Sequence, residues 1–534
     1  MTRSLTTRRG FLKAVGVGAA ALAAPEGTAA PAAPARPNVL LVLTDDQGWT
    51  DTSVRMMADR PDSASGFLRT PALERLAREG MVFSNAYAPA PTCTPTRASI
   101  QFGKTPARLR QTVVHDVLAA SRGIDCKDEV SLARMVKAAG AGYVTAHFGK
   151  WGFPPRPPEH AGYDVTDGNT NNADGDWLSG KGRTPLPADD PKGIFSLTRR
   201  ACDFMARCAA ERKPFFMQVS HYAPHVQHAA RAETIARCRA RPRGGKCQPA
   251  DYADPPPARN AWGLLYAAMI EDLDRGLGML LEKLDELGIA GNTYVLFTSD
   301  NGGGFRGNAP LKGGKASLWE GGLRVPTVVR GPGVKAACRC DVPIAGWDFF
   351  PTIADLIGHA GPLPAGLDGV SLRPLLEKGN AGKIARGGEG LIFHFPWYAG
   401  LAMSAIRVGD HKLLKDLGTG QVRLYNLAED LGETRDLAPS MPRKAAELHE
   451  KLTSYLKAVG AETIELMREA RKKELLGYLE RARREIADLQ EQAAKAPPER
   501  KADLLKKLPD LQKRLKAHEA ALDQLEKARG MRAW

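Results

Sequence analysis

Residues 38–48 read Asn-Val-Leu-Leu-Val-Leu-Thr-Asp-Asp-Gln-Gly, and this stretch indicates the fold class. A short apolar run that ends in polar residues is typical of a strand buried on both faces. Runs of the same kind recur at 143–147, 215–221 and 293–299. Helical patterns separate these runs, at 71–79, 132–139, 197–211 and 262–287. The alternation predicts an α/β fold with a mostly parallel central sheet and helices on both of its faces.

Chemically active side chains stand at the C-terminal end of each predicted strand. Asp45 and Asp46 follow the first run, and Lys150 follows the second; His225 comes after the third, and Asp300-Asn301 after the fourth. Taken singly, each could be a helix cap, a turn or a loop residue. Open α/β sheets, however, bind ligands outside the carboxyl ends of their strands. The four together therefore predict a shared site at one sheet edge.

The residue types at this edge indicate which chemistry it performs. Asp45, Asp46, Asp300 and Asn301 offer only oxygen ligands, which favour a hard cation such as Ca²⁺ or Mg²⁺ over Zn²⁺. Residues 93–97, Cys-Thr-Pro-Thr-Arg, supply a small nucleophile position and the guanidinium of Arg97, while Lys150 and Lys315 add positive charge. A divalent cation with one arginine and two lysines can hold a tetrahedral oxyanion and stabilise charge as it is transferred.

With these motifs in place, the sequence from Pro37 to about Pro439 resembles the formylglycine-dependent sulfatases of the alkaline phosphatase superfamily. The resemblance rests on the order and spacing of several motifs. In addition to 38–48 and 93–97, they are 142–151 (Gly-Tyr-Val-Thr-Ala-His-Phe-Gly-Lys-Trp), 223–225 (Ala-Pro-His), 299–302 (Ser-Asp-Asn-Gly), 314–326, 368–376 and 424–433.

The resemblance implies a mechanism and a role for each matching residue. A separate formylglycine-generating enzyme would oxidise Cys93, and the hydrated aldehyde would attack sulfur, form a covalent sulfo-enzyme and then expel sulfate. Arg97 would orient the hydrate, Lys150 and Lys315 would bind the sulfate, and His225 would protonate the leaving oxygen. The implied Ca²⁺ ligands, with Mg²⁺ as the alternative ion, are Asp45, Asp46, modified Cys93, Asp300 and Asn301.

One position departs from the family pattern. Gly152 stands where the family usually has a histidine that contacts the formylglycine, and His115, His147 or His221 could replace it. Without such a base, the covalent intermediate would break down slowly, and we expect Gly152→His to accelerate that step. Two other functions also fit the sequence: a phosphodiesterase or phosphonate monoester hydrolase, and a catalytically impaired protein that binds sulfated glycans.

The N-terminus predicts export. Residues 7–13, Thr-Arg-Arg-Gly-Phe-Leu-Lys, match a twin-arginine signal, with cleavage expected between residues 28 and 35. The following apolar stretch is too short to span a bilayer, and no later segment offers a membrane span. We therefore expect a periplasmic or secreted protein, modified at Cys93 before export.

Charge and cysteine content limit the partners. The formal net charge of the 534 residues is +15, with no nucleic-acid-binding motif, so charge favours a polyanionic substrate over nucleic acid. The family resemblance implies that this substrate is a sulfated small molecule or polysaccharide. There is no Cys-x-x-Cys pair among the eight cysteines, which argues against a thiolate zinc site. Cys238 and Cys247 flank a short loop and form the best candidate for a disulfide.

We expect four parts in the chain: a signal peptide (1–35), a catalytic domain (36–385), a smaller α+β domain with an antiparallel sheet (386–460) and a helical extension (461–534). Leucines in the extension repeat at heptad-like spacing on two helices joined by a proline turn. This pattern is compatible with a helical hairpin packed on the body of the protein, or with a device for homo-oligomer formation or tethering. Loops at 152–191 and 231–260 are expected to build the substrate pocket, but their sequence does not identify the ester.

Overall fold

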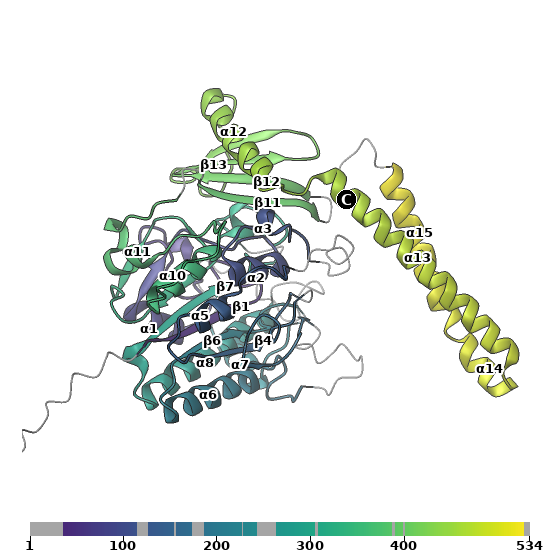
Figure 1. Ribbon diagram of the computed structural model, residues 1–534, viewed down its shortest axis with the longest axis horizontal. Coiled ribbons are helices and arrows are strands. Elements are labelled where there is room, and N and C mark those ends of the chain that lie inside the picture. Colours follow the sequence, from purple (N-terminus) through teal and green to yellow (C-terminus); the bar gives the residue numbers. More distant parts are fainter. Residues whose placement is uncertain are drawn as a thin grey trace, which may run out of the picture. The chain divides into compact units, whose positions relative to one another are not determined.

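A computed structural model describes residues 36–114, 126–153, 156–172, 186–226, 228–242, 263–304, 308–386, 390–398 and 401–527 (Figure 1). The predicted signal peptide, His115 and Cys247 lie outside these residues, so the export signal and the Cys238–Cys247 bridge stay predictions.

The main sheet has eight strands in the order β5-β4-β6-β1-β7-β8-β2-β9. Parallel pairing joins β4 to β6, β6 to β1 and β1 to β7, whereas β8 runs antiparallel to β7 and β2. The predicted mostly parallel sheet is therefore confirmed. The strands are β1 (Asn38–Thr44), β2 (Met81–Phe83), β4 (Val144–Gly149), β5 (Val165–Thr166), β6 (Phe215–Ser220), β7 (Thr293–Ser299), β8 (Thr327–Arg330) and β9 (Cys338–Cys340).

Strand β1 lies at the centre, with all seven residues buried. Val39, Leu41 and Leu43 belong to one hydrophobic core, and Leu40 and Val42 belong to a second. Since successive side chains of a strand point to opposite faces, the sheet separates the two cores. This arrangement explains why the run of residues 38–44 is apolar without alternation.

Helices cover both faces of the sheet (Figure 1). On one face the core is completed by α2 (Cys93–Phe102), α5 (Leu132–Ala138), α10 (Phe349–Leu356) and α11 (Arg373–Lys378). On the other it is completed by α1 (Pro71–Glu79), α6 (Ile194–Ala210) and α8 (Leu264–Glu286). Smaller elements are α3 (Pro106–Leu109), α7 (Ala232–Ala240), α9 (Glu320–Leu323) and a two-stranded sheet of β3 (Ala86–Tyr87) and β10 (Ile344–Ala345).

A second sheet follows in the chain, built from four antiparallel strands. Its strands are β11 (Leu391–Tyr398), β12 (Leu401–Val408), β13 (His411–Asp416) and β14 (Val422–Asn426), and α12 (Pro442–Ala458) follows them. One side of the sheet packs on α12 through Leu448 and Leu452. Its other side packs on Tyr87, Leu323 and Trp347 of the larger part. The predicted antiparallel C-terminal sheet is thus confirmed.

The chain ends in a helical hairpin of α13 (Ile464–Lys495), α14 (Pro498–Leu505) and α15 (Leu508–Lys527). Leucines of the predicted seam, among them Leu475, Leu489, Leu511 and Leu525, are buried where α13 packs on α15. The seam is therefore occupied between the two helices of the hairpin, and oligomer formation through the extension stays a prediction. Among the described helices, none has the length and apolar character needed to cross a bilayer.

Candidate active site

The ends of β1 and β7 bring together two pairs of side chains that carry oxygen ligands. Asp45 and Asp46 follow β1, and Asp300 and Asn301 follow the neighbouring β7. The Asp46 backbone N–H donates to Asp300 Oδ1 at 3.2 Å, and Asn301 Nδ2 donates to Asp46 Oδ1 at 2.8 Å. All four side chains are buried, so the predicted convergence at this edge is present in the fold.

Helix α2 carries Cys93 at its first position and Arg97 one turn later. Every residue of this helix is buried. Arg97 donates from Nε and Nη2 to Asp300 Oδ2, at 3.0 and 2.8 Å, and from Nη1 to the Lys150 carbonyl at 2.5 Å. Arg97 therefore links the helix that bears Cys93 to the ends of both β7 and β4.

Two lysines face the acidic pair after β1. Lys150 directly follows β4 and forms an ion pair with Asp45 Oδ2. Lys315 Nζ lies 2.6 and 2.7 Å from the two carboxylate oxygens of Asp46. Burial acts to raise the pKa of Asp45, but Lys150, His225 and Arg97 outweigh it and hold that pKa well below its usual range. Burial likewise acts to lower the pKa of Lys150, yet Asp45 and then Cys93 raise it.

Asp300 behaves differently from Asp45. Burial and the neighbouring Asp45 charge raise the pKa of Asp300 to about 6, against the opposing effect of Arg97. Three buried carboxylates here face Arg97, Lys150 and Lys315, so the formal charges balance. An added dianionic or monoanionic ester would need further positive charge beside it.

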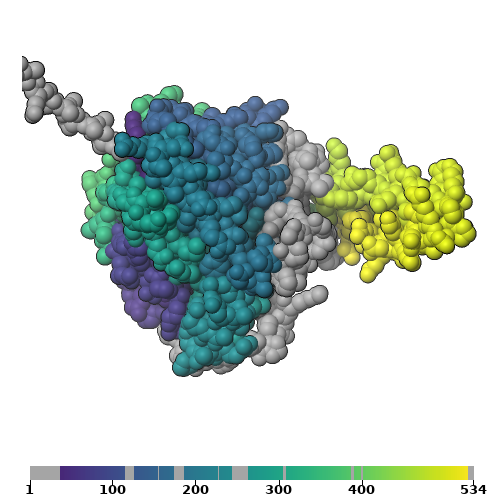
Figure 2. Space-filling view, turned by 90° about the horizontal axis from the view of Figure 1, so that it is seen from below, coloured from purple at the N-terminus to yellow at the C-terminus, as the bar shows by residue number. Residues whose placement is uncertain are grey.

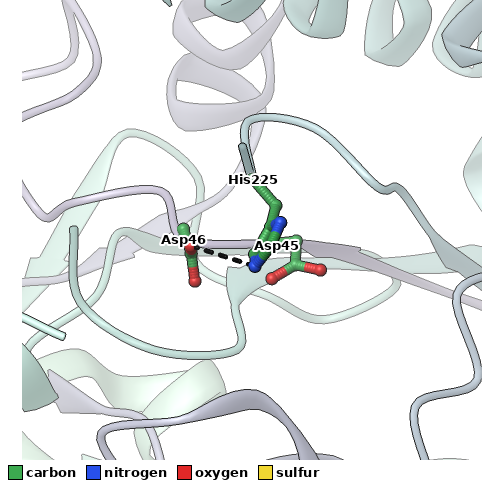
Figure 3. Close-up of side chains that lie close together, drawn as sticks. All are labelled: Asp45, Asp46 and His225. Carbon is green, nitrogen blue, oxygen red and sulfur yellow. Dashed lines mark ion pairs between the residues drawn. The ribbon is translucent and has the colours of Figure 1, made fainter. Parts of the chain in front are cut away.

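His225 reaches the same edge from the loop after β6 (Figure 3). Its Nδ1 lies 2.6 Å from the Val226 carbonyl, which can only accept, so Nδ1 carries the proton. Its Nε2 lies 3.8 Å from Asp46 Oδ2 and 3.3 Å from Asn172 Nδ2. Burial lowers the pKa of His225, although Asp46 opposes this effect. Nε2 is therefore the ring nitrogen that faces Asp46 and is placed to exchange a proton at the site.

The residues present suit a hard cation. Asp45 Oδ1 and Asn301 Oδ1 are buried without a hydrogen-bond partner, and such orphaned oxygens are what a cation would satisfy. Among the described residues, ligand atoms of Asp45, Asp46 and His225 lie within 4.8 Å of one another. The sequence prediction had placed His225 only at the leaving oxygen. The structure adds it to a candidate metal site whose ion is not identified.

Gly152 has a structural reason to lack a side chain. Its φ is +68°, a left-handed conformation, and a Cβ there would lie 2.7 Å from Arg97 Cδ. Arg97 cannot move aside easily, because Asp300 and the Lys150 carbonyl hold its guanidinium. This geometry argues against a gain from a histidine at 152, because its Cβ would press on Arg97; the effect on the rate stays a prediction.

Neither described alternative to that histidine lies free at the site. His147, on β4, packs edge-on to Trp151 and Tyr163, with Nε2 3.2 Å from Ser220 Oγ. Burial lowers the pKa of His147 to about 3 and that of His221 to about 4. His221 has both ring nitrogens buried without a partner and packs near Gly276 of α8. His115 lies outside the described residues.

The segment that bears Lys315 is fixed by a buried charge cluster of Tyr87, Glu320, Arg324, Lys412 and Glu433. Glu320 Oε2 accepts from Tyr87 Oη at 2.7 Å and from Arg324 Nε at 2.8 Å. Lys412 Nζ, from β13, lies 2.8 Å from Glu320 Oε1 and 2.9 Å from Glu433 Oε1. Lys412 of the second sheet thus neutralises Glu320, the first residue of α9, which lies five residues beyond Lys315.

Sequence reasoning missed Asn172 beside His225, and it missed Lys412; Glu433 closes the motif 424–433, but no role was predicted for it. Asn172 stands in a polar run that reads as an ordinary loop, so no pattern marks it. The sequence holds one indication of Lys412: this lysine directly precedes the apolar pair Leu413 and Leu414, and in the structure all three residues are buried in β13.

Comparison with known proteins identifies the family. The sulfatase family profile matches residues 37–359. Human N-acetylgalactosamine-6-sulfatase is 30% identical over 423 residues, which cover 72% of this chain and 73% of that protein. Mouse steryl-sulfatase is 31% identical over 455 residues, 70% of this chain and 69% of that protein.

Solved structures agree on the fold. The crystal structure of Ps i-CgsB in complex with k-i-k-neocarrahexaose superposes with a TM-score of 0.64 at 24% identity, covering 79% of this chain and 93% of that one. A structure of BT4656 with its substrate D-glucosamine-2-N,6-O-disulfate gives 0.62 at 20% identity, covering 80% and 98%. The chain therefore belongs to the sulfatase family, whose members are sulfuric ester hydrolases.

Proposed function

We propose that the protein hydrolyses an aryl or carbohydrate sulfate ester with a formylglycine formed from Cys93, and that the bound cation is Ca²⁺, with Mg²⁺ as the alternative. Strong support comes from Arg97, which joins the helix carrying Cys93 to Asp300 and to the backbone of Lys150. A structural ion pair alone would not require a cysteine at the start of that helix, two lysines and a histidine at the same sheet edge.

Each side chain then has a defined task. Lys150 and Lys315 bind sulfate oxygens, and Arg97 keeps residue 93 beside them. Asp45, Asp46, Asp300 and Asn301 would hold the cation, with modified Cys93 as a further ligand and His225 close to Asp45 and Asp46. A bound cation would supply stabilisation of negative charge at the sulfate. One hydroxyl of the formylglycine hydrate would take the sulfuryl group as the alcohol leaves; the other would then lose its proton as the C–O bond to sulfate breaks, and water would convert the resulting aldehyde back to the hydrate. The doubly protonated ring of His225 would give its Nε2 proton to the leaving alcohol, while its Nδ1–H stays bonded to the Val226 carbonyl. Asp46, whose Oδ2 lies 3.8 Å from Nε2, favours that charged form of the ring.

We also propose that a formylglycine-generating enzyme acts before export by the twin-arginine route to the periplasm or beyond. Support for export comes from residues 7–13 and for modification from Cys93 within 93–97.

Turnover of 4-nitrophenyl sulfate by protein co-produced with a formylglycine-generating enzyme tests the function. A panel of sulfated mono- and polysaccharides tests the substrate class, and bis(4-nitrophenyl) phosphate tests the diesterase alternative. Cys93→Ala should abolish sulfate release, while Cys202→Ala, a cysteine on α6, should not. Faster turnover of the diester than of every sulfate ester would contradict the proposal.

A further inference from the structure

Asn172 belongs to the segment that follows β5, and this segment is bound to the end of β4. Thr170 Oγ1 donates a hydrogen bond to the Gly149 carbonyl and accepts one from the Trp151 backbone N–H at 3.0 Å. The segment therefore lies against the strand end that carries Lys150.

Asp167, in the same segment, provides a second anchor. Its Oδ2 accepts from the Gly149 backbone N–H at 2.8 Å and from Nη2 of Arg200, on α6, at 2.7 Å. The segments that carry Asp167 and Arg200 lie side by side on one face of the molecule (Figure 2, blue to teal). Contacts with both β4 and α6 thus hold the backbone that leads to Asn172.

The side-chain amide of Asn172 lies beside Nε2 of His225. Its Nδ2 is 3.3 Å from that atom, while the Val226 carbonyl binds Nδ1 on the other side of the ring. Among the described residues, no donor reaches Asn172 Oδ1, although this atom is buried. Buried amide oxygens usually have a donor, so this amide holds an unused acceptor next to the atom that contacts His225.

Such an amide can bind both the neutral and the charged form of the imidazole ring. Asparagine carries a donor and an acceptor at nearly equivalent positions, and a half-turn of the amide exchanges them. The present orientation directs an Nδ2–H at a neutral Nε2. The turned amide would direct Oδ1 at an Nε2 that carries a proton, and Oδ1 would thereby gain the donor that it lacks.

We propose that Asn172 is a positioning residue for proton transfer from His225 to the leaving alcohol. The proposal rests on the proposed function, which makes His225 the proton donor. The amide at Nε2 and the Val226 carbonyl at Nδ1 hold the ring at both nitrogens, so the direction of the Nε2–H bond is fixed.

The same contact leaves the proton available to the substrate. At 3.3 Å it is longer than a usual N–H hydrogen bond and correspondingly weak, so the leaving oxygen can replace it. As the bond between sulfur and the ester oxygen breaks, that oxygen takes the Nε2 proton. The ring returns to the neutral form, with its remaining proton on Nδ1, and Nε2 again accepts from Asn172 Nδ2–H.

The dependence of the rate on the leaving group tests this role. 4-Nitrophenyl sulfate releases a phenol that needs no proton, whereas phenyl sulfate has a poorer leaving group that needs the acid. We compare kcat/KM, which includes the step that releases the alcohol. Asn172→Ala should lose less than about threefold with 4-nitrophenyl sulfate and about 10- to 10²-fold with phenyl sulfate, because a misplaced proton donor affects only the ester that requires it.

A double-mutant cycle shows whether Asn172 acts through His225. In a His225→Ala background, Asn172→Ala should cause little further loss with phenyl sulfate. Asn171→Ala, at the exposed neighbouring position, is the matched control and should leave the ratio of the two kcat/KM values unchanged. This ratio, taken within one variant, does not depend on how much of the protein is folded.

An equal loss with both esters in Asn172→Ala, or independent losses in the double variant, would overturn the proposal. The same change of ratio in Asn171→Ala would also overturn it. A wild type whose ratio equals that of His225→Ala would refute the role of His225 and, with it, that of Asn172. Absence of turnover of either ester by wild-type protein co-produced with the maturing enzyme would instead contradict the proposed function itself.

Discussion

Arg97 donates two hydrogen bonds to a single oxygen of Asp300, from Nε at 3.0 Å and from Nη2 at 2.8 Å. Both side chains are buried, so neither charge has water to replace its partner. The remaining oxygen, Oδ1, accepts from the Asp46 backbone. Asp300 therefore connects the cysteine helix to the strand end that supplies the candidate cation ligands.

Replacing Asp300 should affect metal binding and stability together. Asp300→Asn removes the nearer of the two carboxylates that pair with Arg97 and leaves Asp45 Oδ2 at 3.6 Å, and breaking a buried pair costs about 3–5 kcal/mol of unfolding free energy. Calcium content by atomic emission should fall below one equivalent, and activity should be lost, as it should in wild-type protein after exhaustive chelation. Asp272→Asn, which also removes a buried partner of an arginine, should lose stability but keep its calcium. Full activity of the chelated wild type would contradict the assignment.

Modification of Cys93 should be visible by mass spectrometry. Conversion of the thiol to an aldehyde removes about 18 Da from the peptide that contains residue 93. The shift should be present in protein co-produced with the maturing enzyme and absent without it, and the sulfatase rate should follow the converted fraction. An active preparation in which residue 93 is entirely cysteine would refute the mechanism.

Gly152 should not tolerate a side chain. Gly152→Ala adds left-handed strain of about 1–2 kcal/mol, and its Cβ contact with Arg97 adds an overpacking cost of about 1–3 kcal/mol. Gly142→Ala is the matched control, since Gly142 has φ +72° but no atom within 4 Å of its added Cβ. Displacement of Arg97 should also lower kcat by about 10²-fold in the first variant only. Equal melting temperatures and rates for the two variants would show that position 152 does not act through Arg97.

Lys412 should stabilise the protein far more than a surface lysine does. Lys412→Met leaves Glu433 buried without its cation and Glu320 with Arg324 as its remaining ion-pair partner, at a cost of about 3–5 kcal/mol. Lys444→Met removes a lysine that is 30% exposed and pairs with Glu447, and should cost less than about 1 kcal/mol. Urea unfolding measures both. If the two variants unfold at the same urea concentration, the buried charge cluster does not hold the second sheet in place.

Truncation should separate the hairpin from its root. Glu462 accepts a hydrogen bond from Thr112 and Met467 packs on Val113, so the start of α13 belongs to the body of the protein. A chain that stops after Lys473 should keep its turnover of 4-nitrophenyl sulfate. One that stops after Gly460 should unfold at a lower temperature. Gel filtration of the first variant shows whether the hairpin affects oligomeric state. Loss of turnover in a folded chain ending at Lys473 would place the hairpin in the catalytic cleft.

The sequence allowed the centre of the fold to be predicted because its signals there are local. The bounds of β1 and β7 coincide with the apolar runs at 38–44 and 293–299, and the polar residues after them meet as parallel strands require. The outer strands were not predicted. β2 has three residues and β8 has four. Apolar runs this short cannot be told from a single turn of helix by their pattern.

Other features depend on contacts that a sequence does not display. The need for glycine at 152 comes from Arg97, fifty-five residues earlier, and from a backbone angle. A cavity lined by arginines unites segments near residues 70, 235 and 275, each of which reads alone as an ordinary charged helix surface.

The position of β1 between β6 and β7 has a consequence for biosynthesis. Asp46 accepts its hydrogen bond from Asn301 and contacts Asp300, which the ribosome adds 254 residues later. At about 5–20 residues per second, that interval is roughly 13–50 s. Arg97 is added 203 residues before Asp300, so for roughly 10–41 s it lacks its Asp300 partner, and the helix that buries Cys93 cannot take its final place. An enzyme that modifies Cys93 in an open chain therefore has tens of seconds to act before folding closes the site.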